Sequence, residues 1–101
     1  MKFDALVIAG GKNEGALKEY SDKEYESLIE IGGKPMVLHV LEAVEGVGDI
    51  ENIVMVGPDE LNKVSDKKYN ILKPEGTLVD NIKRGIEALN EEHYIIILTS
   101  D

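Results

Sequence analysis

Short apolar runs alternate with segments of helical spacing along this chain, and this alternation limits the possible folds more than any other feature. Buried strands are predicted at residues 3–9, 53–56, 69–72 and 94–99, with a short extended piece at 27–31. Most of these runs stop at glycine or proline. Nearly continuous apolar runs of this kind are typical of strands that are buried on both faces of a parallel sheet. The run at 94–99 has the strongest strand character and is expected to be deeply buried.

The segment after the short extended piece carries the signals of a helix. Pro35 suits the first helical position, where its missing N–H is not needed. Gly46 and Gly48 are expected to end the helix. Its apolar face, at helical spacing, is predicted to consist of Met36, Val37, Val40, Leu41 and Val44.

Two further helices are predicted between the later strands. Asp59 is expected to cap a short helix that runs through residues 61–64. Thr77, followed by Asp80, resembles a capping box at the start of a longer helix. The apolar stripe of that helix is predicted to consist of Leu78, Ile82, Ile86 and Leu89.

Strands that alternate with helices in this way imply parallel pairing with right-handed crossovers. The predicted fold class is therefore α/β, a three-layer Rossmann-like open parallel sheet with helices on both faces. A length of 101 residues suits one small domain. We expect residues 1–101 to form one domain or part of one.

The composition narrows the range of functions. The net charge of −9 opposes nonspecific binding to nucleic acid, but it does not exclude a small nucleotide. No apolar run approaches the roughly 20 residues of a membrane helix, and the N-terminus lacks the pattern of a signal peptide. The sequence has no cysteine, which fits a cytoplasmic location. We therefore expect a cytoplasmic protein without a nucleic-acid or membrane partner.

Gly10 and Gly11, directly after the first strand, make up the first candidate binding segment. In open α/β sheets, ligands bind beyond the carboxyl ends of the strands, and glycine lets the backbone approach them closely. The spacing does not match the G-x-G-x-x-G dinucleotide fingerprint. A P-loop is excluded because Ala16 and Leu17 follow Gly15 where Lys and Ser or Thr are needed. From these residues alone, a ligand-binding loop and a purely structural turn are equally good readings.

Two more segments are expected at the same edge of the sheet. Gly76 and Thr77 open a helix, whose free N–H groups can bind an anion or a base edge, although Thr77 could simply cap the helix. Asp101 follows the last strand and could hold Mg²⁺, which prefers oxygen ligands, or serve only as a turn residue. His39 and His93 are read as structural.

Four motifs together, in the same order as in a known family, are more specific than any one of them. Their residues are Leu6 to Gly11, Gly32-Gly33-Lys34-Pro35-Met36, Glu75-Gly76-Thr77 with Asn81 and Gly85, and Ile97 to Asp101. This pattern resembles the nucleotidyltransferases, in particular the molybdenum-cofactor guanylyltransferase-like (MobA-like) NTP transferases. The resemblance runs through nearly all of the chain.

The resemblance implies a role for each segment. The turn formed by Ala9, Gly10, Gly11 and Lys12 would wrap the nucleotide phosphates, and Asp101 would hold Mg²⁺. The loop with Gly76, Thr77 and Asn81 would contact the base or the ribose. The implied reaction is attack by a small phosphorylated acceptor on the α-phosphorus of an NTP, either CTP or GTP, with release of pyrophosphate.

The sequence departs from the family at two positions. Gly15 and Glu26 stand where the family carries an Arg and a Lys that bind phosphate. Lys12, Lys18 or Lys23 could replace them, and Lys12 and Lys18 are predicted to act in catalysis together with Asp101. Two other functions stay open, a nucleotide or sugar-nucleotide sensor without catalysis and a structural module whose glycines only form turns.

Family members continue beyond the position of Asp101. By this resemblance residues 1–101 are the nucleotide-binding N-terminal half, and the acceptor-binding half is absent. Such a fragment is expected to be inactive alone. An exposed last strand would also favour self-association.

Overall fold

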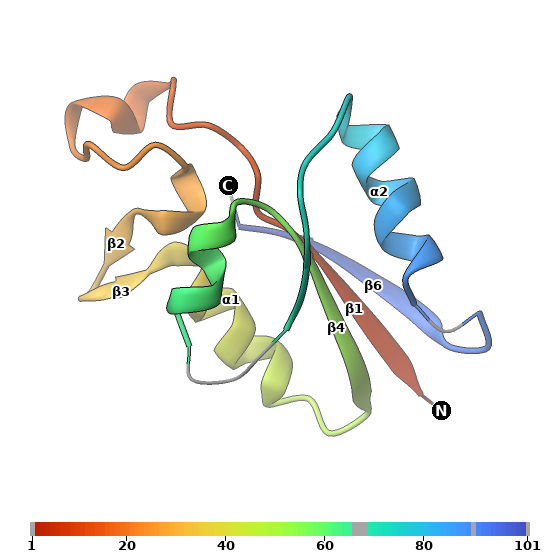
Figure 1. Cartoon of the computed structure of the whole chain (residues 1–101). Helices are drawn as coiled ribbons and strands as arrows, with labels where there is room; N and C mark the ends of the chain where they lie inside the picture. The colour runs from red at the N-terminus through yellow and green to blue at the C-terminus, as the bar shows by residue number, and fades with distance from the viewer. Residues whose placement is uncertain (1, 66–68, 90, 101) are drawn as a thin grey trace.

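The computed structural model describes residues 2–65, 69–89 and 91–100. Its centre is a parallel sheet of β1 (Phe3–Ile8), β4 (Ile50–Val56), β5 (Asn70–Leu72) and β6 (Tyr94–Thr99), in the order β5-β4-β1-β6 (Figure 1). The strands β2 (Glu30–Ile31) and β3 (Lys34–Pro35) form a small antiparallel hairpin beside it. The predicted α/β fold with a parallel sheet is confirmed.

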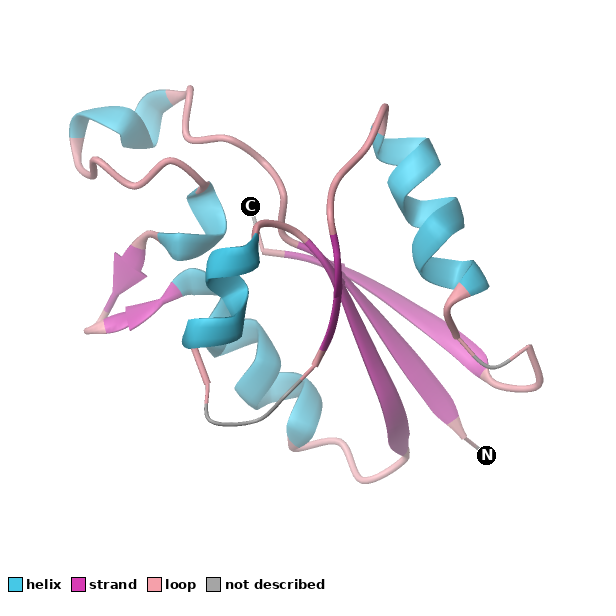
Figure 2. Cartoon of the chain, in the orientation of Figure 1, coloured by secondary structure: helices cyan, strands magenta, loops and turns pink. Residues whose placement is uncertain are grey.

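The strand β1 is central because its residues are apolar on both faces. Val7 and Ala9 face one side, where they pack with α1 (Met36–Glu45). Leu6 and Ile8 face the other side, which is covered by α2 (Leu78–Glu87). Figure 2 shows the two helices on opposite sides of the sheet, as the prediction of helices on both faces required.

The order of the strands fixes where a ligand can approach. From β1 the chain moves to β4 and β5 on one side and then returns to β6 on the other side of β1. The direction in which strands are added therefore reverses between β1 and β6. Doubly wound sheets bind ligands at such a switch point.

The position of β6 corrects one expectation. The run 94–99 is not the most buried strand, because β6 lies at an edge of the sheet formed by the described residues and has only β1 as a neighbour. Its residues are half-buried or exposed, with Tyr94 61% and Ile97 45% exposed. The prediction that the last strand lies at an edge agrees with this position, whereas the prediction that it is deeply buried is wrong.

The predicted stripe of α2 is also wrong in part. Leu89 is buried and Ile82 packs against the core, but Leu78 and Ile86 are exposed. The helix instead turns Asn81 and Gly85 to the sheet. A Cβ on Gly85 would come within 2.8 Å of Leu6 Cδ2, so the glycine lets the helix approach the central strand and sets its rotation.

Several local elements differ from their sequence patterns. Residues 26–28 form a 3₁₀ turn, η2 (Glu26–Leu28), instead of an extended piece, because Ser27 is drawn inward to donate to the Ala9 carbonyl at 2.8 Å. Pro35 precedes the first helical residue of α1, since it pairs with Glu30 in the hairpin.

Pro58, and not Asp59, occupies the cap position of η3 (Asp59–Lys63), without a side-chain capping bond. Residues 16–19 form the 3₁₀ helix η1 (Ala16–Glu19). The strand pattern at 53–56 extends back to Ile50, where pairing with β1 begins.

A polar cluster closes the opposite, amino-terminal edge of the sheet. The fully buried Asp4 accepts hydrogen bonds at Oδ1 from the Asn52 N–H and side-chain amide and from His93 Nδ1 at 2.9 Å. His93 Nε2 also lies 3.3 Å from Glu51 Oε2. His93 is therefore structural, as predicted. So is His39, whose Nε2 contacts the Ile31 carbonyl at 2.6 Å. Among the described residues, no helix has both the length and the apolar character needed to cross a membrane.

Candidate functional site

The glycine turn after β1 forms the floor of the candidate site. The Ala9 N–H is already used, since it donates to the Val56 carbonyl at 2.8 Å as a continuation of the sheet. No described residue accepts a hydrogen bond from the Gly10 N–H. Of the backbone N–H groups predicted to bind phosphate, that of Ala9 is therefore part of the sheet, whereas that of Gly10 can donate to a ligand.

Gly10 brings the turn against the loop that follows β5. A Cβ on Gly10 would lie 2.8 Å from Pro74 Cγ, so only glycine allows this approach. Beside this contact is a hollow of about 190 Å³. It is lined by Ile8, Gly10, Gly11, Val56, Pro74, Leu78 and Asn81. The structure thus brings together three of the residues predicted to bind nucleotide, Gly10, Gly11 and Asn81.

Asn81 is the polar side chain of this hollow. It is only 8% exposed, because it lies on the face of α2 that is turned to the sheet. Its Oδ1 accepts hydrogen bonds from the Glu75 N–H at 2.7 Å and from Arg84 Nη1 at 3.3 Å. Arg84 Nη1 also donates to the Lys73 carbonyl. The amide is therefore held firmly at the wall of the hollow.

Thr77 and Gly76 do not line this hollow. Gly76 has φ of +69°, a conformation that favours glycine, and it turns the chain into α2. Thr77 forms the predicted capping box, in which its Oγ1 accepts from the Asp80 N–H at 3.2 Å and its N–H donates to Asp80 Oδ2 at 2.9 Å. The Thr77 hydroxyl also donates to Asp80 Oδ2 at 3.0 Å. The hydrogen bonds that the Asp80 carboxylate accepts, from the Thr77 N–H first and the Thr77 hydroxyl second, lower the pKa of Asp80. Both residues thus have a structural task, and their predicted contact with nucleotide stays a prediction.

The predicted lysines divide between two hollows. One of about 460 Å³ lies within the long loop and is lined by Lys12, Asn13, Glu14, Lys18, Ser21, Asp22, Lys23 and Glu24. The other, of about 400 Å³, lies over the carboxyl ends of the strands and is lined by Gly10, Lys12, Tyr25, Pro58, Asp59, Glu60, Lys73 and Pro74. Lys12 lines both, whereas Lys18 and Lys23 line only the first. Lys12 is therefore the predicted lysine that the fold places beside Gly10.

Lys73 was missed by the sequence reasoning. It directly follows β5 at the carboxyl edge of the sheet. Arg84, which fixes the backbone of this loop, was also missed, because a charged residue on a helix usually lies on the solvated face. The two departures from the family pattern lie close together, since a side chain at Gly15 would begin 3.9 Å from Glu26 Oε1.

The end of β6 reaches the same edge. The Ser100 N–H donates to the Ile8 carbonyl at 3.0 Å, which places Ser100 beside the glycine turn. Its hydroxyl is buried and has no hydrogen-bond partner among the described residues. Asp101, the predicted catalytic and metal-binding residue, lies outside the described residues. Within 2–65, 69–89 and 91–100, no three carboxylate or imidazole groups converge as a metal site.

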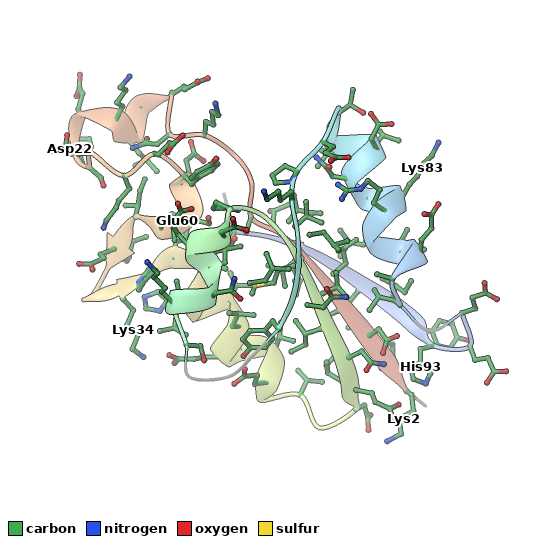
Figure 3. The ribbon with its side chains drawn as sticks, in the orientation of Figure 1. Lys2, Asp22, Lys34, Glu60, Lys83 and His93 are labelled. Atoms are coloured by element: carbon green, nitrogen blue, oxygen red, sulfur yellow. The ribbon has the colours of Figure 1, made fainter. Side chains whose placement is uncertain are left out.

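Figure 3 shows how the charged side chains are spread over the molecule. Lys83 projects from α2 away from the sheet, and Glu60 lies on η3. Lys34, in the small hairpin, pairs with Glu42 at 2.9 Å and is thus tied to α1. The lysines that the fold places beside the glycine turn are therefore few, and they come from the loops after β1 and β5.

Comparison with known proteins points to one kind of enzyme. The chain is 37% identical over 62 residues to a 2-C-methyl-D-erythritol 4-phosphate cytidylyltransferase of Clostridium perfringens, covering 60% of this chain and 26% of that protein. It is 34% identical over 64 residues to a probable molybdenum cofactor guanylyltransferase of Pyrococcus horikoshii, covering 63% of this chain and 30% of that protein. The chain resembles nucleotidyltransferases. No model of a known protein family matches the sequence.

Solved structures agree in fold. A hypothetical transferase from Thermus thermophilus matches all of this chain and 40% of its own with a TM-score of 0.78 and 28% identity. A nucleotidyl transferase from Methanothermobacter thermautotrophicus matches 99% of this chain and 50% of its own with a TM-score of 0.77 and 17% identity. The curated relatives are nucleotidyltransferases, and the matches with this chain span about a quarter to a third of their length.

Proposed function

We propose that this chain is the nucleotide-binding part of a nucleotidyltransferase that transfers NMP from CTP or GTP to a small phosphorylated acceptor and releases pyrophosphate. One observation carries the proposal. The glycine turn after β1 and Asn81 at the start of α2 line one hollow at the carboxyl edge of the sheet. That edge, at a switch point of strand order, is where doubly wound sheets bind ligands.

In this proposal the base enters the hollow beside Asn81, and the phosphates lie over Gly10. The Gly10 N–H would donate to a phosphate oxygen, as backbone amides at glycine turns do. Lys12 and Lys73, which line the neighbouring hollow of about 400 Å³, would supply positive charge to the phosphate chain. Their charge is needed because the protein as a whole carries −9 and repels anions.

The chemistry would be an in-line displacement at the α-phosphorus. An oxygen of the acceptor phosphate forms a bond to this phosphorus while the bond to the bridging oxygen breaks and pyrophosphate leaves. Lys12 and Lys73 would stabilise the charge that grows on the phosphate oxygens. We propose Asp101 as a ligand of Mg²⁺, which neutralises phosphate charge when it is bound. We place the reaction in the cytoplasm, which fits a sequence without cysteine.

A second candidate is a nucleotide or sugar-nucleotide sensor without catalysis. It is favoured by Glu26, whose carboxylate lies where a cation would serve phosphate transfer, beside Gly15, which offers no side chain. A sensor would bind nucleotide without needing the metal. The two candidates therefore differ in the metal dependence of binding.

Isothermal titration of the 101-residue chain with CTP and GTP, with and without Mg²⁺, tests the proposal. We expect weak binding that requires Mg²⁺ and is lost in Asp101→Ala. Lys12→Met and Lys73→Met are each expected to weaken binding about tenfold, equivalent to about 1.4 kcal/mol. Lys83→Met is the matched control, because Lys83 points away from the sheet (Figure 3).

Three outcomes would count against this assignment. Metal-independent binding that survives Asp101→Ala would favour the sensor. Unchanged affinity for nucleotide in both Lys12→Met and Lys73→Met would show that the phosphates do not bind in the hollow that these lysines line. An absence of nucleotide binding would leave the glycine segments as turns and favour the structural module.

A further inference from the structure

Resting on the proposed function, we propose that Arg84 is a positioning residue that makes Asn81 present its amide as a hydrogen-bond donor to the nucleotide base. The geometry points to Arg84 because one guanidinium nitrogen, Nη1, donates both to Asn81 Oδ1 and to the carbonyl of Lys73. Arg84 therefore links Asn81, on α2, to the loop that follows β5.

The orientation of the Asn81 amide follows from its neighbours. Both groups that contact Oδ1, the Glu75 N–H and the Arg84 guanidinium, can only donate. A flipped amide would place its NH₂ group against these donors and lose both bonds. The oxygen must therefore face Glu75 and Arg84, and the NH₂ group is left for the hollow.

No described residue accepts a hydrogen bond from Asn81 Nδ2. The residue is 8% exposed and lines the hollow together with Gly10 and Gly11. Asn81 Nδ2 is not among the buried side-chain atoms without a hydrogen-bond partner, so it stays accessible from the hollow. A ligand that supplies an acceptor there gains a hydrogen bond from the amide.

An amide NH₂ group with two hydrogens and no acceptor favours a base edge that carries two adjacent acceptors. Guanine offers O6 and N7, whereas adenine pairs N7 with a donor amino group. Cytosine offers O2 and N3, whereas uracil carries an N–H at N3. The orientation held by Arg84 therefore favours CTP or GTP over UTP and ATP.

Arg84 also holds the wall of the hollow in place. Its bond to the Lys73 carbonyl fixes the residue before Pro74, and Pro74 is the residue that packs on Gly10. Without Arg84, the Glu75 N–H still donates to Asn81 Oδ1, but the loop loses its second tie to α2, the one through the Lys73 carbonyl. We expect both affinity and discrimination between bases to fall.

The test compares Arg84→Met with the wild-type chain in titrations with CTP, GTP, UTP and ATP. For the preferred base, CTP or GTP, we expect affinity to fall about tenfold. The affinity for the two other nucleotides should change by less, so that the selectivity ratio falls. Arg84→Lys, which can donate to one of the two acceptors, should restore part of the selectivity. Lys83→Met, the neighbouring substitution on α2, should change neither quantity.

A second measurement reads the orientation directly. The side-chain NH₂ signals of Asn81 in a ¹⁵N-labelled protein should shift when the preferred nucleotide is added, and should shift on Arg84→Met even without nucleotide. Urea unfolding shows whether each variant is folded. If Arg84→Met is unfolded, Arg84→Lys carries the comparison.

The outcomes separate this inference from the proposed function. If wild-type protein binds no nucleotide, the proposed function fails and the ligand role of Arg84 falls with it. If nucleotide binds but folded Arg84→Met and Arg84→Lys keep the full selectivity ratio, only the role of Arg84 is overturned. A uniform loss of affinity for all four nucleotides would likewise refute selectivity through Asn81.

Discussion

Replacing Gly10 by Ala is the sharpest test of how the site is assembled. The new Cβ would lie 2.8 Å from Pro74 Cγ and 3.3 Å from Pro74 Cβ. Carbon atoms pack best at about 3.5–4.0 Å, so Pro74 Cγ would have to retreat by about 0.7 Å. The proline ring cannot rotate away, and the whole loop before α2 must move with it.

The cost of this substitution can be bounded. Overpacking of a well-packed contact destabilises a protein by about 1–3 kcal/mol, and the backbone itself adds no strain because φ of Gly10 is not positive. A shift of about 0.7 Å in the loop, set by the same contact limit, would also widen the hollow and misalign Asn81. We therefore expect nucleotide affinity to fall about tenfold, or about 1.4 kcal/mol.

Urea unfolding measures the first effect and nucleotide titration the second. Gly15→Ala is the matched control in the same loop, since its Cβ would meet only Glu26 Oε1 at 3.9 Å. A Gly10→Ala protein with wild-type stability and wild-type affinity would refute the close packing of the two loops. Lost stability with wild-type affinity would separate that packing from nucleotide binding.

Three further substitutions test the fold that carries the site. His93→Ala removes a donor from the fully buried Asp4 and should lower the free energy of unfolding by about 3 kcal/mol in urea titrations. Thr77→Ala removes the helix cap and should cost about 1 kcal/mol at neutral pH, measured in the same way. The pKa of Asp80 lies below its ordinary value of 3.8. Ionised Asp80 therefore stabilises the folded protein above pH 3.8, and this stabilisation is lost as the pH falls through the lowered pKa. Thr77→Ala should flatten this pH dependence in unfolding curves at acidic pH. Leu61→Ala empties a site that is 1% exposed beneath η3 and should cost about 2–5 kcal/mol.

Each of these predictions has an internal control. His39→Ala should have little effect because that ring is exposed, and an equal loss in both histidine variants would refute the special role of the Asp4 cluster. Leu78→Ala, at a residue 57% exposed, should cost far less than Leu61→Ala, and equal losses would contradict the packing of η3. If the free energy of unfolding of Thr77→Ala still falls at acidic pH as in the wild-type protein, the pH dependence does not arise from Asp80.

The general fold could be predicted because its signals are local. The apolar run of β1 and the capping box of Thr77 and Asp80 each specify a conformation from adjacent residues, and both occur in the structure. The rotation of α2 could not be predicted in this way. It depends on Gly85 packing against Leu6, a contact between residues far apart in the sequence.

The candidate site shows the same division. Gly10 and Gly11 were recognisable from their place after an apolar run, and Asn81 only through the family resemblance. Arg84 gave no signal, because its role depends on reaching back to Lys73 across the start of the helix. The edge position of β6 was also invisible in its own residues, whose apolar character resembles that of a central strand.

The central place of β1 has a consequence for how the chain folds. Phe3 pairs with Ile50 on one side and with Tyr94 on the other, so β1, which is synthesised before β4 and β6, completes its pairing last. Such long-range pairing slows folding, and an unpaired apolar strand can be captured by other chains in the meantime. We therefore expect the yield of soluble protein to depend on the temperature of expression, with aggregation before β6 is made as the main loss.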